Sequence, residues 1–138
     1  MKFLGLDLGS RTCGVAISDA SGFLARTYTT IRFKDDDYDY AALEVVKICE
    51  QEKVNDIVLG YPKHMNGDVG IRGKISEDFK AKLLSYHPFN VILWDERLSS
   101  VAVDRAMLEG NMRRNFRKEH KDELAAVVIL QGYLDFKR

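Results

Sequence analysis

The chain contains little cysteine, no long hydrophobic run and no excess charge of either sign. Its two cysteines, Cys13 and Cys49, have neither metal-ligand spacing nor a disulfide framework, which favours a protein of the reducing cytoplasm. The longest apolar run, Leu124 to Leu130, is far too short to cross a bilayer. The N-terminus reaches an acid at position 7 and does not resemble a signal peptide. We therefore expect a cytoplasmic protein that has no membrane partner.

Lysine and arginine together number 21, as do aspartate and glutamate, so the formal net charge is zero. This balance gives no global electrostatic signature of a nucleic-acid binder, and such a role would need a local basic patch. Hydrophobic residues make up 46% of the chain and charged residues 30%, which is typical of soluble globular proteins. A chain of 138 residues can bury a proper core, and we predict one domain spanning residues 1–138.

The hydrophobic periodicity predicts an α/β fold. Three strands joined by short turns come first and must form an antiparallel meander, whereas the next two strands each follow a helix and are expected to run parallel to strand one or to each other. The expected strands span residues 2–8, 12–18, 23–33, 56–59 and 91–94, and the expected helices span 40–53, 74–86, 99–109 and about 119–136. Both cysteines lie on apolar faces and are interpreted as core residues. The acidic run at 35–39 is expected to begin the first helix, whose dipole favours negative charge there.

Asp7 is an unexpected residue in the first strand, where the chain reads F-L-G-L-D-L-G-S-R. A strand entering a core normally excludes a carboxylate, because burying an unpaired charge is costly. Gly5 and Gly9 flank it and leave room for close approach to the backbone. Taken alone, Asp7 is equally well explained as a turn cap that accepts hydrogen bonds from the N–H groups of Gly9 or Ser10.

A second acidic position follows the fifth strand, in L-W-D-E-R. The strand is expected to end at Trp94, and alternation directs Asp95 and Glu96 to opposite faces, so only one of them can join Asp7 directly. Arg97 can pair with either acid or with a substrate phosphate. Taken alone, these acids are better explained by a surface salt bridge at a strand end.

The third acid is Asp122, at the start of K-D-E-L-A-A-V-V-I-L-Q-G-Y-L. On a helix it lies within about 40° of Ala126 and Ile129, on the side expected to pack against the sheet, whereas Glu123 and Gln131 face elsewhere. Taken alone, Asp122 could simply be an acid placed for the helix dipole.

The joint occurrence of acids at a strand middle, a strand end and a helix start favours a functional interpretation. Three converging carboxylates would repel one another and raise their pKa values unless a cation neutralised them. Magnesium suits an all-oxygen site with few protein ligands. Two such ions would serve the hydrolysis of a phosphodiester without a nucleophilic side chain.

Four ordered motifs resemble those of the YqgF family, also called RuvX. They read G-L-D-L-G-S-R-T-C-G-V-A-I-S-D, V-L-G-Y-P-K-H-M-N-G, W-D-E-R-L-S-S and K-D-E-L-A-A-V-V-I-L-Q-G-Y-L, and the resemblance extends from Lys2 to about Asp135. Members are small bacterial proteins described as Holliday junction resolvases or pre-16S rRNA nucleases. The resemblance implies a ribonuclease H-like fold, with a five-stranded mixed sheet flanked by helices.

The resemblance also implies an acidic triad of Asp7, Glu96 and Asp122 that binds divalent metal, as two Mg²⁺ or Mn²⁺ ions. Glu96 is chosen over Asp95 on the family match alone. The sequence departs from the family pattern in two places. The basic run before the last acid is interrupted by Glu119 and His120, and Ser99-Ser100 stand where threonine is common.

Candidate nucleic-acid contacts lie in two segments and beside the triad. Residues 113–121 contain five lysines or arginines against one acid, a patch able to neutralise several phosphates, although a solvated connector would have the same composition. The loop 63–73, which includes His64 and Arg72, leaves the carboxyl end of strand four, where α/β sheets commonly place ligand contacts. Turn formation with Gly67 is the simpler role of Asn66. The candidate binding residues are Arg97, Lys63, Asn66, Arg113, Arg114, Arg117, Lys118 and Lys121.

These features predict a metal-dependent nuclease that processes the 5′ end of pre-16S rRNA, with structured RNA or ribosome precursors as partners. The alternatives are a Holliday junction resolvase acting on branched DNA and a non-catalytic nucleic-acid-binding assembly factor. An ATPase is less favoured: D-L-G-S-R also looks like the phosphate hairpin of actin-like ATPases, but the chain is too short for their second lobe. The chain is expected to be a monomer or a homodimer.

Overall fold

A computed structural model describes residues 1–61, 70–95 and 121–137. The elements are β1 (Phe3–Leu8), β2 (Thr12–Ser18), β3 (Ala25–Arg32), α1 (Tyr38–Glu52), β4 (Asp56–Tyr61), α2 (Ile71–Tyr86), β5 (Asn90–Asp95) and α5 (Lys121–Lys137). All five predicted strands are present, together with the three predicted helices that fall within the described ranges. The helix expected at 99–109 and the connector at 112–120 lie outside the described residues.

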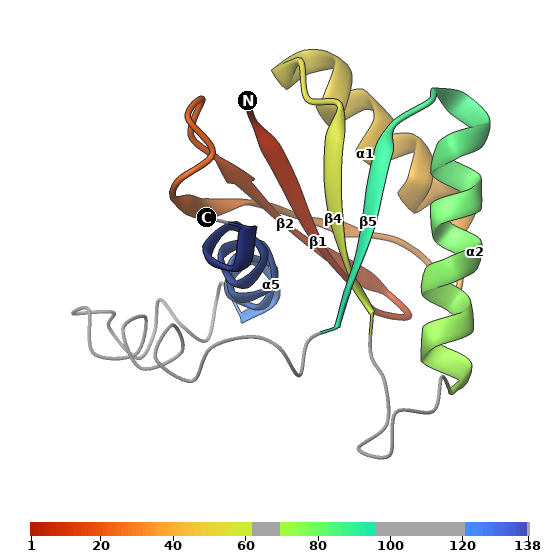
Figure 1. Cartoon of the computed structure of the whole chain (residues 1–138). Helices are drawn as coiled ribbons and strands as arrows, with labels where there is room; N and C mark the ends of the chain where they lie inside the picture. The colour runs from red at the N-terminus through yellow and green to blue at the C-terminus, as the bar shows by residue number, and fades with distance from the viewer. Residues whose placement is uncertain (62–69, 96–120, 138) are drawn as a thin grey trace.

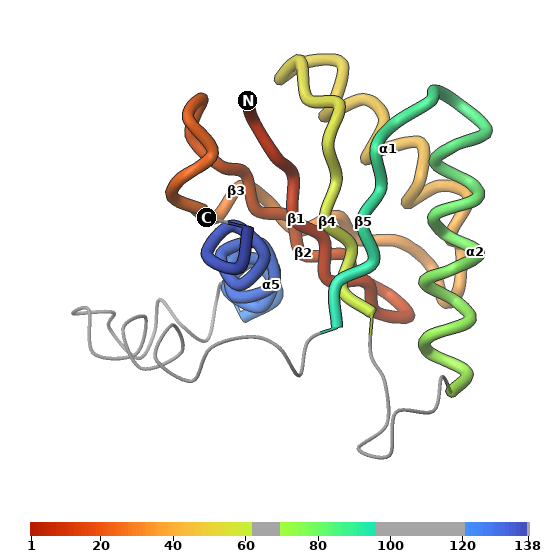
Figure 2. Tube along the Cα trace, in the orientation of Figure 1, coloured from red at the N-terminus to blue at the C-terminus, as the bar shows by residue number. Residues whose placement is uncertain are grey.

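The five strands form one mixed sheet in the order β3-β2-β1-β4-β5. β1 pairs antiparallel with β2 and β2 with β3, which confirms the predicted meander. β4 pairs parallel with both β1 and β5, which confirms that the two later strands follow the direction of the first. Figure 2 shows β1 and β4 at the centre of the sheet, so the carboxyl end of β1 is flanked by neighbours on both sides.

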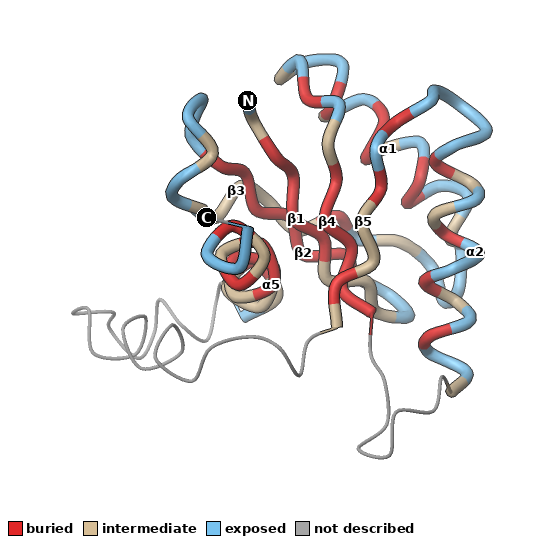
Figure 3. Tube along the Cα trace, viewed as in Figure 1, coloured by how far each residue is buried: buried red, intermediate tan, exposed pale blue. Residues whose placement is uncertain are grey.

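Helices cover both faces of the sheet, α1 and α2 on one and α5 on the other (Figure 1). Because side chains alternate along a strand, Leu4 and Leu6 of β1 enter the core beneath α1 and α2. Phe3 enters the second core beneath α5, where Val58 and Leu130 also lie. In Figure 3 the central strands are buried along most of their length, whereas exposed residues concentrate on the outer sides of the helices.

Several boundaries differ from the sequence-based expectation for local reasons. β3 begins at Ala25 rather than at residue 23, because the N–H groups of Phe23 and Leu24 donate to the Asp19 carboxylate within the turn. α1 begins at Tyr38, and the expected acidic start is confirmed: Asp37 caps this helix and accepts from the Tyr40 N–H at 3.2 Å.

Both cysteines are buried in the core beneath α1 and α2, as predicted. β4 extends to Tyr61 and β5 to Asp95, two residues and one residue beyond their expected ends. α2 begins at Ile71, three residues earlier than the periodicity indicated.

Candidate functional site

The candidate site lies at the edge of the sheet where β1, β4 and β5 end. These three strands are parallel, so their carboxyl ends meet at one edge, as the lower side of Figure 1 shows. α5 begins at the same edge, because the backbone of Asp122 lies against Gly14 in β2, which is the residue paired with Asp7 of β1. Asp7 and Asp122, which are separated by more than a hundred residues in the chain, therefore lie close together.

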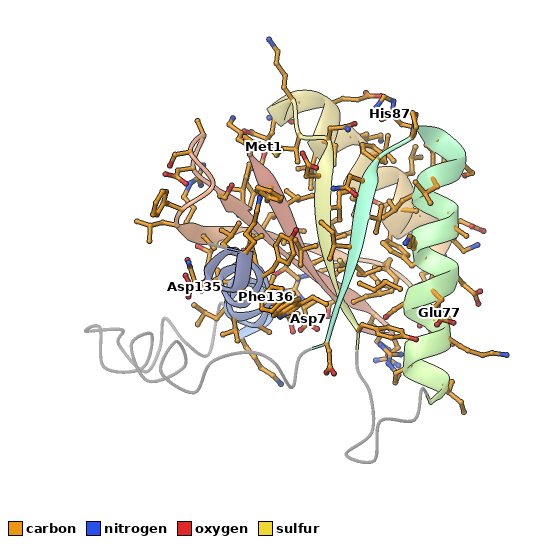
Figure 4. All side chains as sticks on the ribbon, viewed as in Figure 1. Met1, Asp7, Glu77, His87, Asp135 and Phe136 are labelled. Atoms are coloured by element: carbon orange, nitrogen blue, oxygen red, sulfur yellow. The ribbon has the colours of Figure 1, made fainter. Side chains whose placement is uncertain are left out.

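Asp7 is half-buried on the face of the sheet that α5 covers, and it is labelled in Figure 4. Because side chains alternate along β1, residues 3, 5 and 7 point to the same face, and Phe3 packs in the core there. The residue of β2 that pairs with Asp7 is Gly14. On the other side of β1, the last pair with β4 is Leu6–Leu59, and the next residue of β4 is Gly60. Glycine on both neighbouring strands leaves the Asp7 carboxylate without a flanking side chain inside the sheet.

Gly14 is required by the packing of α5. A Cβ atom at this position would lie 1.9 Å from the carbonyl oxygen of Asp122 and 2.4 Å from its carbonyl carbon. Both contacts are to backbone, which cannot rotate away as the end of a side chain can. The prediction that Asp122 starts the packing side of the last helix is confirmed, since Ala126 and Ile129 along that side are buried.

The electrostatics agree with this proximity. Burial raises the pKa of the Asp7 carboxyl above its ordinary value of 3.8, the negative charge of Asp122 raises it further, and the positive charge of Arg72 opposes both. The thiol of Cys13, the next residue to Gly14, also has a raised pKa, first because it is buried and then because both carboxylates act on it. The carboxylates of Asp7 and Asp122 therefore lie within electrostatic reach of each other and of the Cys13 thiol.

The turn-cap explanation of Asp7 loses support at Gly9. The Gly9 N–H donates to the Thr12 carbonyl at 2.7 Å, so this donor is already satisfied by backbone. Gly5 allows close approach to the backbone, as expected, and the group that approaches is α5: a Cβ at Gly5 would lie 2.6 Å from the Cβ of Leu130.

Asp95 faces away from Asp7. It pairs with Tyr61 in the register of β4 and β5. The preceding residue, Trp94, packs in the core beneath α5, so alternation directs Asp95 to the face of α1 and α2. Glu96, the third expected ligand, and Arg97 lie outside the described residues. Among the residues that the structure describes, no group of three or more histidines, cysteines, aspartates and glutamates could hold a metal ion.

Two residues were misjudged from the helical wheel of the last helix. Glu123 was expected to face away from the packing side, but it is buried, with 9% of its surface exposed. Gln131 was expected to face elsewhere as well, but its amide accepts from the Ala25 N–H at 2.8 Å and donates to the Phe23 carbonyl at 3.0 Å, at the start of β3. Both errors arise because α5 contacts four strands, β1, β2, β3 and β4, and so buries more than one narrow side.

Arg72 was named with the loop 63–73, where ligand contacts are expected, but the structure places it in a helix. It belongs to the first turn of α2 and donates from Nη2 to the Leu8 carbonyl at 2.8 Å. Of the nucleic-acid-binding candidates, only Lys121 is described, and it is exposed beside Asp122 at the start of α5. The remaining candidates, Lys63, Asn66, Arg97, Arg113, Arg114, Arg117 and Lys118, lie outside the described residues.

No helix within the described ranges is both long enough and apolar enough to cross a membrane.

Comparison with known proteins gives matches across almost the whole chain. A family profile described as "RuvX: Holliday junction resolvase" matches residues 1–136. Proteins of Staphylococcus aureus strains JH9 and MW2, each named "Putative pre-16S rRNA nuclease", are 44% identical over 135 residues, which covers 97% of this chain and 95% of each relative.

Two solved structures share the architecture. Thermus thermophilus RuvC in complex with a Holliday junction substrate matches with a TM-score of 0.65 at 11% identity, covering 99% of this chain and 96% of the other. The fowlpox virus Holliday junction resolvase matches with a TM-score of 0.62 at 11% identity, over 100% of both chains. At this identity the likeness concerns the fold alone, and it confirms the expected ribonuclease H-like sheet.

Proposed function

The chain belongs to the RuvX family, as its four motifs predicted, and from that premise we propose that it is a metal-dependent nuclease that hydrolyses phosphodiester bonds near the 5′ end of pre-16S rRNA. The observation that carries this proposal is the meeting of Asp7 and Asp122 at the carboxyl edge of the sheet. The choice of RNA follows the name of relatives that are 44% identical to this chain, which describes them as pre-16S rRNA nucleases.

The residues present fit divalent metal ions. Asp7 and Asp122 offer only carboxylate oxygens, the ligands that Mg²⁺ and Mn²⁺ prefer. Burial and then the charge of Asp122 raise the pKa of Asp7, and a bound cation would offset both by stabilising the ionised carboxylate. We propose Glu96 as the third ligand, because Asp95 faces the other side of the sheet and a strand continued by one residue would return to the face of Asp7. Bound as a pair, such ions supply the Lewis acidity that phosphodiester hydrolysis needs.

The protein's own contribution is to hold charges in place before substrate arrives. The Gly14 contact fixes the first turn of α5 against β2, so Asp122 cannot withdraw from Asp7 without separating the helix from the sheet. Lys121 is exposed next to Asp122 and is proposed to bind backbone phosphate, together with the basic and amide side chains at residues 63, 66, 97, 113, 114, 117 and 118.

The test is cleavage of a pre-16S 5′ leader transcript and of a four-way DNA junction, in parallel, with Mg²⁺ and with a chelator. We expect the parent protein to cleave the transcript only when metal is present. Asp7→Asn and Asp122→Asn should each reduce the rate about a hundredfold or more, because each removes a charged ligand worth several kcal/mol in the transition state. Parental cleavage rates in both variants would refute the assignment of Asp7 and Asp122 as metal ligands of the active site.

Asp135→Asn is the matched control, because Asp135 is an exposed aspartate at the other end of the same helix. It should cleave as the parent does. Cleavage of the junction but not of the transcript would replace the rRNA assignment with the resolvase activity named in the family description. Nucleic-acid binding without cleavage of either substrate would favour a non-catalytic assembly factor.

A further inference from the structure

Arg72 links the first turn of α2 to the strand that carries Asp7. Its Nη2 donates to the carbonyl of Leu8, the residue after Asp7, at 2.8 Å. Its side chain also lies near the Tyr38 hydroxyl, where its positive charge opposes the rise in the pKa of that group. The guanidinium is therefore fixed at the carboxyl end of β1, on the side opposite α5, within electrostatic reach of the Asp7 carboxylate.

The residues around Arg72 are themselves fixed. The Tyr38 O–H donates to the Asp36 carboxylate at 3.0 Å, and the backbone N–H of Asp36 donates to the Ser10 carbonyl at 2.8 Å. This series of contacts connects the start of α1, the turn after β1 and the start of α2. It gives the long side chain of Arg72 a defined position before any ligand binds, which lowers the entropic cost of binding one.

Within the described part of the chain, no carboxylate forms an ion pair with the Arg72 guanidinium. Its acceptor, a backbone carbonyl, and the nearby phenol are both neutral. Arg11, in the turn at the same edge, is different because its guanidinium is paired with Asp35. A single hydrogen bond to a carbonyl does not need a guanidinium, so anchoring β1 does not by itself account for an arginine at position 72.

We propose that Arg72 binds a backbone phosphate of the nucleic acid at the end of β1, beside Asp7 and Asp122, and so positions the polymer for cleavage. Arg72 is exposed, so a large substrate can reach it, and the guanidinium fork matches the geometry of phosphate oxygens. The inference rests on the proposed nuclease function and deepens it, because it names a positioning residue for that same site.

The experiment measures binding of a fluorescent structured RNA, in a chelator so that no cleavage occurs, across a series of salt concentrations. We expect Arg72→Gln to weaken binding about tenfold, as the loss of one charge-assisted contact. The slope of log affinity against log salt should fall by about 1, because one phosphate is no longer neutralised. Arg72→Lys should keep the slope but bind several-fold more weakly than the parent, because it keeps the charge and loses the fork.

Arg26→Gln is the matched control, because Arg26 is an exposed arginine in β3 that pairs with Ile17, far along the sheet from the end of β1. It should bind as the parent does. Equal affinity and slope for Arg72→Gln and Arg26→Gln would overturn the proposal and leave Arg72 as a structural link. If Arg72→Gln does not fold, Arg72→Lys decides the matter, and parental affinity in that variant would overturn the proposal.

Cleavage kinetics separate this inference from the proposed function. With Mg²⁺, Arg72→Gln should raise KM for the RNA substrate. The melting temperature of the variant is measured in the same buffer, so that any loss of folded protein can be separated from the rise in KM. An inactive Asp7→Asn protein together with unchanged binding by Arg72→Gln would refute only the role of Arg72. A parent protein that neither binds nor cleaves RNA or the DNA junction would refute both.

Discussion

Gly14→Ala is predicted to separate the two described carboxylates of the site while leaving both of them in the chain. The new methyl carbon would lie 1.9 Å from the Asp122 carbonyl oxygen, whereas real contacts of this kind are essentially never below 3.0 Å. The first turn of α5 must therefore retreat from β2 by about 1 Å. Because the contact involves backbone on both sides, no rotamer change can absorb the clash.

The size of both effects follows from this geometry. Overpacking of this kind costs about 1–3 kcal/mol, which for a domain of this length corresponds to a melting temperature lower by about 3–10 °C. A 1 Å misplacement of a reacting constellation lowers the rate about a hundredfold. Activity should therefore fall far more than the modest loss of stability, and metal should raise the melting temperature less than it does in the parent.

The assay compares transcript cleavage and thermal unfolding for the parent, Gly14→Ala and Gly5→Ala. Gly5→Ala is the matched control, because its methyl carbon would lie 2.6 Å from the Cβ of Leu130, two turns along α5 from Asp122. It should lose similar stability and much less activity. Parental cleavage and melting temperature in Gly14→Ala would refute the packing of Asp122 on β2, and equal activity losses in both variants would refute the local argument.

Two further predictions concern the dependence of stability on pH. In a chelator at pH 7, Asp7→Asn should melt at a higher temperature than the parent, because the raised pKa means that ionised Asp7 opposes folding. This difference should shrink as the pH falls through the raised pKa of Asp7 towards the ordinary value of 3.8, and a lower melting temperature for the variant at pH 7 would contradict the burial of the charge. The effect of ionised Asp19 on stability has the opposite sign, because hydrogen bonds from Ser21, Phe23 and Leu24 lower the pKa of Asp19 to about 2. Asp19→Ala should therefore melt below the parent above pH 4, and the gap, followed by circular dichroism, should close as the pH falls towards about 2; a gap that persists there would refute a role for ionised Asp19.

The sequence predicted the elements and their directions because these depend on local patterns. Alternation in β1 and β2, short turns and helices before β4 and β5 were sufficient for a mixed sheet with an antiparallel meander. Boundaries were less accurate wherever a side chain competes with the backbone ladder, as Asp19 does at the start of β3. The motif resemblance identified the family, and it selected Glu96 over Asp95, a choice that alternation alone left open.

By itself, the sequence determined that acids stand at a strand middle, after a strand end and at a helix start, in a chain with the motifs of one family. Only the tertiary structure decided that Asp7 and Asp122 meet, that Gly14 is the residue that permits it and that Arg72 lies on the other side of β1. The physical reason is that periodicity reports which way a side chain points within its own element. Contacts between β1, α2 and α5 depend instead on how closely whole elements approach. The approach of α5 is limited by Gly14 of β2, which stands in the same motif as Asp7, but no pattern within a single element indicates its contact with Asp122.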